Sequence, residues 1–128
     1  MKKKLLCLSA ALITSTCFGW KGTQVKRIYN KSNHAAKITR AFKEDFWIGP
    51  NESKDLGNNY MGRIYAKDKN LDRFTLKTAG KTYYLYDHNW KIYKWNGHKL
   101  HDKGKNSTKC VNITIKSDGS LAFSNSSC

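Results

Sequence analysis

The sequence predicts an all-β fold, a small antiparallel β-sandwich or barrel of about eight or nine short strands that follow an N-terminal signal peptide. Short runs rich in β-branched and aromatic residues alternate apolar with polar side chains, as half-buried strands do. Clusters of turn-forming residues separate these runs at intervals of roughly 8–12 residues. Beyond the first 19 residues, no run repeats its apolar side chains with the period of a helix.

Residues 1–19 are typical of an export signal. Three lysines at residues 2–4 precede an apolar stretch at residues 5–13, and small residues follow it. We expect cleavage after Gly19, and the alternative is acylation at Cys17, as in a lipoprotein. The apolar stretch is too short to cross a bilayer comfortably, so we expect no transmembrane segment in the mature chain. The sequence therefore predicts a secreted or periplasmic protein of bacterial type.

Residues 20–128 are enough for a single β-sandwich domain and too few for two. The whole chain has 24 Lys and Arg residues against 9 Asp and Glu residues, a formal charge of +15, and loss of the three signal lysines lowers it to +12. Such a charge favours anionic partners, namely lipid headgroups, acidic glycans or nucleic acid, although no nucleic-acid-binding motif is present. Alternatively the charge serves solubility, because the basic residues are spread along the whole chain.

The first half of the chain predicts strands with imperfect alternation, the first of them bulged. Strands are expected at residues 23–30, 35–42 and 46–48, with turns at residues 31–34 and 49–53 between and after them. The charged residues Lys43, Glu44 and Asp45 interrupt the pattern before the third strand. A loop is expected after the second turn.

Two further strands are expected at residues 60–67 and 73–78, before the aromatic-rich residues 81–95. The second of the two alternates clearly, with apolar side chains at Phe74 and Leu76. Residues 97–109 are polar and basic and show little strand character.

Residues 81–95 contain six of the sixteen aromatic residues and predict a β-hairpin around a polar centre. We expect an even-length loop with His88 and Asn89 in a tight turn, which places Tyr86 opposite Lys91. Side chains then divide between two faces. The predicted core face carries Tyr83, Leu85, Trp90 and Ile92, and the opposite face carries Thr82, Tyr84, Tyr86, Lys91, Tyr93 and Trp95.

Aromatic rings interleaved with lysine can stack on sugars or bases, or settle at a membrane interface, while the lysine attracts an anion. The candidate binding residues are therefore Tyr84, Tyr86, Lys91, Tyr93 and Trp95. The alternative is that these side chains form a second core layer.

The C-terminal residues predict a second hairpin, with an odd-length loop at residues 117–119. Its core face should carry Val111, Ile113, Ile115, Leu121 and Phe123. This register places Cys110 and Cys128 opposite or two residues apart, on the face turned from the core. Because the other two cysteines lie in the signal, we expect a disulfide between Cys110 and Cys128.

No constellation in the sequence specifies catalysis, so no catalytic residue, metal ligand or cofactor is expected. His98, His101 and Asp102 could bind a metal if their loop curled back, but lysines surround them. The sequence favours a non-enzymatic binding module for an anionic, glycan-bearing or lipid-bearing surface. The alternatives are a secreted nuclease-type toxin that uses a histidine, chiefly His98 or His101, with a lysine, and a protein-interaction module for an acidic partner.

Overall fold

The computed structural model describes residues 22–40, 43–57, 62–67, 74–105 and 110–127. These residues form eleven strands and no helix, which confirms the all-β prediction. The predicted signal at residues 1–19 lies outside the described residues. The strands are β1 Gly22–Asn30, β2 Ala36–Arg40, β3 Lys43–Ile48, β4 Ser53–Asp55, β5 Arg63–Tyr65, β6 Phe74–Thr78, β7 Lys81–His88, β8 Lys91–Lys94, β9 Lys99–Asp102, β10 Cys110–Ile115 and β11 Leu121–Ser126.

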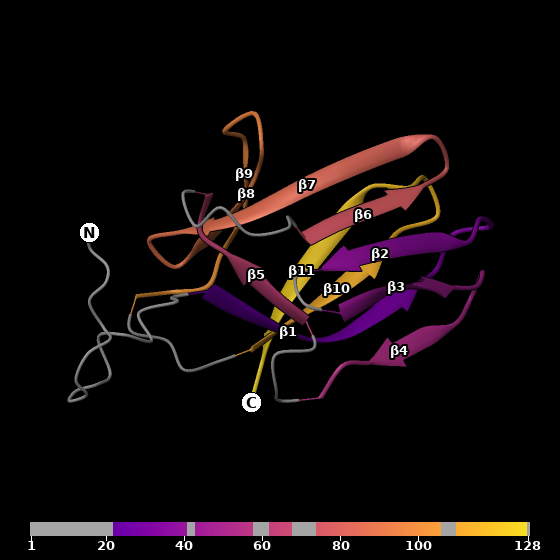
Figure 1. The fold of residues 1–128 in the computed structure, drawn as a ribbon, viewed down its shortest axis with the longest axis horizontal. Helices are drawn as coiled ribbons and strands as arrows, with labels where there is room; N and C mark the ends of the chain where they lie inside the picture. Colours follow the sequence, from indigo (N-terminus) through magenta and orange to yellow (C-terminus); the bar gives the residue numbers. More distant parts are fainter. Residues whose placement is uncertain (1–21, 41–42, 58–61, 68–73, 106–109, 128) are drawn as a thin grey trace.

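The strands form two sheets (Figure 1). A five-stranded sheet has the order β11-β10-β1-β4, with β5 also paired to β1, and a six-stranded sheet has the order β3-β2-β6-β7-β8-β9. The strand pairs are antiparallel except that β1 runs parallel to β10. The expectation of a wholly antiparallel fold was therefore wrong at this pair. The predicted bulge in β1 is confirmed and lies between Val25 and Arg27.

One cluster of buried hydrophobic side chains receives residues from both sheets. Alternation along the strands explains its membership, since every second side chain turns to the same face. Each fully buried Ile, Leu, Val or Phe side chain stabilises the fold by roughly 1.5–3 kcal/mol. The cluster contains Val25, Ile28, Ala36, Ile38, Ile48, Leu56, Ile64, Phe74, Leu76, Leu85, Ile92, Val111, Ile113 and Ile115.

The structure has more strands than the eight or nine expected, because two short polar strands lie where loops were predicted. β4 begins at Ser53, the last residue of the predicted turn at residues 49–53, and β9 lies within residues 97–109. Both are edge strands of their sheets. An edge strand needs backbone pairing on one side only, and exposed polar side chains suit such a position, so apolar alternation is absent. β3 also begins earlier than predicted, at Lys43.

The C-terminal hairpin has the predicted register, with Ile113 opposite Phe123 and Ile115 opposite Leu121. Cys110 pairs with Ser126 at the other end of the hairpin. Its side chain is fully buried, although its position along β10 alternates with the core residues. Cys128 lies outside the described residues, so its disulfide with Cys110 stays a prediction.

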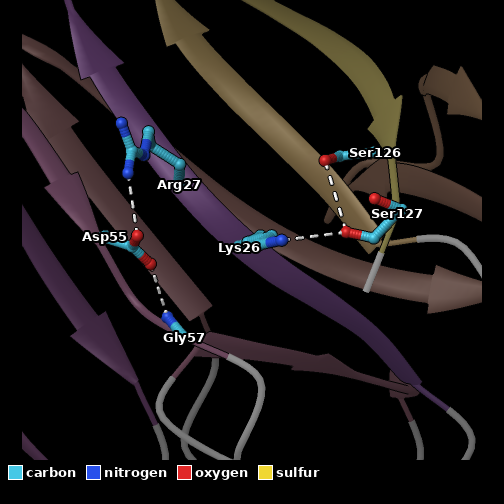
Figure 2. A network of polar contacts seen from close by, with 6 residues as sticks. All are labelled: Lys26, Arg27, Asp55, Gly57, Ser126 and Ser127. Carbon is cyan, nitrogen blue, oxygen red and sulfur yellow. Dashed lines mark hydrogen bonds and ion pairs between the residues drawn. The ribbon is translucent and has the colours of Figure 1, made fainter.

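Polar contacts connect β1 to β4 and to Ser127, which follows β11 (Figure 2). Arg27 forms an ion pair with Asp55 on β4, with 2.8 Å between Nη2 and Oδ2. The hydrogen bond from Arg27 and a second one from the Gly57 amide hold the pKa of Asp55 below its ordinary value. Lys26 donates to the Ser127 carbonyl over 3.1 Å and thereby holds the end of the described chain against β1.

Candidate aromatic binding site

The β7–β8 hairpin turns through Asn89 and Trp90, which both have positive φ, 49° and 66°. A two-residue turn of this kind requires positive φ at both central positions. The predicted turn at His88 and Asn89 was therefore wrong by one residue, and Tyr86 lies opposite Tyr93 instead of Lys91. The loop length is even, as expected, so the two faces keep nearly the predicted membership.

The inward face of the hairpin is core, as predicted. Leu85 and Ile92 are almost completely buried, with 1% and 0% of their surface exposed. Trp90, which was expected on this face, lies in the turn, where the Lys103 ammonium is 5.8 Å from its ring centroid. Asp87 takes an inward position opposite Ile92 and is also buried.

The outward face brings three of the predicted binding residues into contact, and we call them the aromatic cluster: Tyr86, Tyr93 and Trp95. Tyr86 and Tyr93 stack with 5.3 Å between centroids and an interplanar angle of 11°. Trp95 meets Tyr86 edge-on at 5.5 Å and 84°. Tyr84 extends from the same face of β7 with 42% of its surface exposed.

A lysine from outside the hairpin completes the cluster. The Lys67 ammonium lies 5.2 Å from the Tyr86 centroid and 4.7 Å from the Trp95 centroid. It also donates a hydrogen bond to the Trp95 carbonyl over 3.3 Å. These contacts hold a positive charge at a defined place beside the rings, since a cation over an aromatic face is attracted by the ring quadrupole.

Lys67 was missed by the sequence analysis. It follows β5, and only the folded structure shows that the end of β5 reaches β7, through a bridge between Ala66 and Asp87. Lys91 was predicted and lies on the outward face, half-buried, opposite His88 on β7 and Asp102 on β9. The outward face therefore combines stacked rings with two lysines.

A buried hydrogen bond links the hairpin to β1 of the other sheet. Thr23 on β1 donates a hydrogen bond from its hydroxyl to the Asp87 carboxylate. Burial raises the pKa of Asp87, while the Thr23 hydrogen bond and the charge of Lys103 act in the opposite direction. Burial lowers the pKa of Lys103, and attraction to Asp87 opposes this shift. The hydrogen bond joins β1 to β7 across the two sheets.

The residues considered for metal binding do not converge. In β9, His101 pairs with Ile92 and Asp102 with Lys91, so the two side chains turn to opposite faces. His101 stacks on Phe123 at 5.7 Å, and its Nε2 lies 2.8 Å from the Asn125 side-chain oxygen. Across the described ranges, no three His, Cys, Asp or Glu side chains are grouped to hold a metal ion.

The histidines considered for nuclease chemistry are also dispersed. His34 lies between β1 and β2, His88 ends β7, and His98 precedes β9. Among the described residues, the ring of His88 contacts Asn89 and the ring of His101 contacts Asn125, so the hydrogen bonds of these two rings go to asparagine and not to a lysine or a second histidine. A general acid and base pair would need such proximity to a common substrate atom.

The described residues also include one open cavity of about 320 Å³ next to β4, far along β1 from the hairpin. It is lined by Tyr29, Asn30, Lys31, Asn51, Glu52 and Ser53. The Asn30 side chain at its base donates to the carbonyls of His34, Ile48 and Gly49, so this side chain stabilises the surrounding turns.

The chain matches no protein-family model, no curated protein and no solved structure. None of the described residues lies in a helix long and apolar enough to cross a membrane. The functional proposal therefore depends on the residues of the aromatic cluster and their surroundings.

Proposed function

We propose that this chain is an exported β-sandwich protein that acts by binding, and that the outward face of the β7–β8 hairpin binds an anionic surface bearing glycans or lipid headgroups. The signal-like residues 1–19 and the charge of +15 support export and an anionic partner. The shared core of the two sheets supports the sandwich.

The observation that carries this proposal is the position of Lys67 against Tyr86 and Trp95. The rings restrict the lysine side chain, so less conformational entropy is lost when an anion binds its ammonium. The remaining ring surfaces of the cluster can contact the apolar faces of sugars or the glycerol region of a lipid. An anion and an apolar surface can thus be bound together.

The outward faces of the two hairpins differ in a way that favours β7–β8, although Arg27 and Tyr29 of β1 also lie on the outward face of the five-stranded sheet. On the β10–β11 side, the face opposite the core carries small side chains, with less aromatic area or charge to bind a partner. These side chains are Asn112, Thr114, Ala122, Ser124 and Ser126. Tryptophan, tyrosine and arginine are the usual energetic centres of binding surfaces, whereas serine and threonine are under-represented there.

The test is binding of the purified chain to glycan arrays and to vesicles with and without anionic lipid, at physiological salt. Trp95→Ala and Lys67→Ala should each weaken binding about tenfold or more, the loss typical of a central contact residue. Lys116→Ala removes the same charge from the exposed β10–β11 turn and should leave binding unchanged. Equal binding by all variants, with unchanged circular dichroism, would refute the assignment of this face.

The same preparation distinguishes the other functions considered. Cleavage of RNA or DNA that His98→Ala and His101→Ala abolish would establish the nuclease class instead. Recovery of an acidic protein that declines with added salt would indicate a charge-driven protein partner.

A further inference from the structure

A second aromatic residue stands exposed on the same sheet, far from the hairpin. Among the described residues, the exposed large hydrophobic side chains are Trp47, with 64% of its surface exposed, and Tyr84, with 42%. Trp47 lies on β3, the opposite edge strand from β9. Single exposed hydrophobic side chains are common on protein surfaces, so the neighbours of Trp47 determine whether it belongs to a larger binding surface.

The strand register places Trp47 on the same face as the aromatic cluster. Trp47 pairs with Lys37 on β2, Lys37 pairs with Lys77 on β6, and Lys77 pairs with Thr82 on β7. Directly paired residues lie on the same side of a sheet. Because Thr82, Tyr84 and Tyr86 alternate with the core residue Leu85, this side is the outward one.

Positive charge follows the same path. Lys37 and Lys77 lie between Trp47 and the hairpin, and Lys99 on β9 pairs with Tyr93 beyond it. The Lys37 ammonium lies 5.9 Å from the Trp47 centroid, so lysine and aromatic ring are again adjacent. Lys91 of the hairpin and Lys67 beside it add to this charge. These lysines outnumber the neighbouring acids, which are Asp102 and Asp45, the ion-pair partner of Lys37.

The outward face of the six-stranded sheet is long enough to contact several units of an extended ligand. Trp47 and Lys99 lie on the first and last of six strands, so five spacings of about 4.8 Å, or roughly 24 Å, separate them across the sheet. Figure 1 shows β7, β6, β2 and β3 side by side along this path. Neighbouring strands are rotated by about 20–25°, so the face twists along its length.

We propose that one linear acidic polysaccharide binds across this face, from Trp47 through Lys37 and Lys77 to the aromatic cluster and Lys99; this inference rests on the proposed function. A flexible chain can follow the twist, whereas a planar bilayer would contact only part of the face. A nucleic acid has a phosphate at every unit and favours a dense basic track with open ring faces. Here rings separate the lysines, and Tyr93 and Lys67 cover Tyr86.

The experiment measures affinity against fragment length for sulfated heparin fragments and carboxylated polygalacturonate fragments, from disaccharides to chains longer than about 24 Å. Affinity should rise with length until the fragment spans the face. Trp47→Ala and Lys77→Ala should weaken binding of the longest fragments about tenfold, equivalent to ~1.4 kcal/mol, and leave disaccharide binding unchanged. Trp95→Ala should weaken binding at every length.

Lys116→Ala is the charge-matched control for Lys77→Ala, since both lysines are exposed and Lys116 lies outside this face. It should bind every fragment as the wild type does. Equal melting temperatures would show that the variants are folded.

Fragment binding that depends on Trp95 but not on length or on Trp47 would overturn the extended site and leave the proposed function intact. Binding to anionic vesicles without fragment binding, or tighter binding of single-stranded DNA of equal charge, would overturn the polysaccharide assignment. Failure to bind fragments and vesicles alike would refute the proposed function itself.

Discussion

The hydrogen bond from Thr23 to Asp87 gives a sharp test of how the two sheets are joined. Both residues are buried, one on β1 and the other on β7. Thr23→Val replaces the hydroxyl with a methyl group of similar size and leaves the Asp87 carboxyl without its donor. The free energy of unfolding should therefore fall.

The magnitude follows from the charge of the acceptor. A hydrogen bond to an ionised group contributes roughly 1.5–3 kcal/mol, against 0.5–1.5 kcal/mol for a neutral pair. Thr23→Val should therefore cost about 1.5–3 kcal/mol at a pH above the folded-state pKa of Asp87, and less when Asp87→Asn is already present. The coupling free energy in the double-mutant cycle should be about 1 kcal/mol.

Urea unfolding followed by tryptophan fluorescence provides the measurement, with equal m values as the check that all four proteins unfold alike. A cost of Thr23→Val below about 0.5 kcal/mol would refute this account, because it would mean that the bond contributes nothing net. Equal costs in the wild-type and Asp87→Asn backgrounds would refute the role of the charge.

Three further predictions concern stability. Burial raises the pKa of Asp87 above its ordinary value of 3.8, so protonation at low pH favours the fold. As pH rises from 3.8 through the folded-state pKa, the free energy of unfolding of the wild type should fall relative to that of Asp87→Asn by up to ~1.4 kcal/mol per pH unit. Urea unfolding at several pH values measures this difference, and a difference that does not change with pH would contradict the prediction. Ala79→Asn should stabilise the β6–β7 turn by roughly 0.5–1 kcal/mol, since Ala79 has a φ of 51° and asparagine tolerates this region better; an unchanged melting temperature would count against it. Leu76→Ala should cost about 2–5 kcal/mol in urea unfolding, because Leu76 is fully buried among core side chains, and a loss below 1 kcal/mol would show that the cavity collapses.

Much of the fold could be predicted because its central strands alternate strongly. Phe74 and Leu76, and likewise Ile113 and Ile115, mark core faces that only one register can bury together. The polar edge strands β4 and β9 were not predicted, because their side chains show no apolar alternation. They are strands because their backbones pair with a neighbouring strand.

The sequence predicted which hairpin residues share the outward face, but it did not predict their exact pairing or the residues that other strands bring to this face. The parity of the hairpin loop determined which residues share the outward face, so Tyr86, Tyr93 and Trp95 were placed together despite the misplaced turn. Lys67 and Trp47 could not be found this way. Their positions depend on pairing between strands distant in sequence, and a single sequence contains no direct signal for such pairing.

The parallel pairing of β1 with β10 has a consequence for the order of assembly. Among the strands of the described residues, β1 is synthesised first and lies inside its sheet, and its neighbour β10 is the second-last. That sheet cannot close until nearly the whole chain is available, and such distant pairings slow folding. A nascent chain that lacks β10 and β11 would therefore retain an unpaired edge on β1, and an unpaired strand edge is prone to pair with other chains.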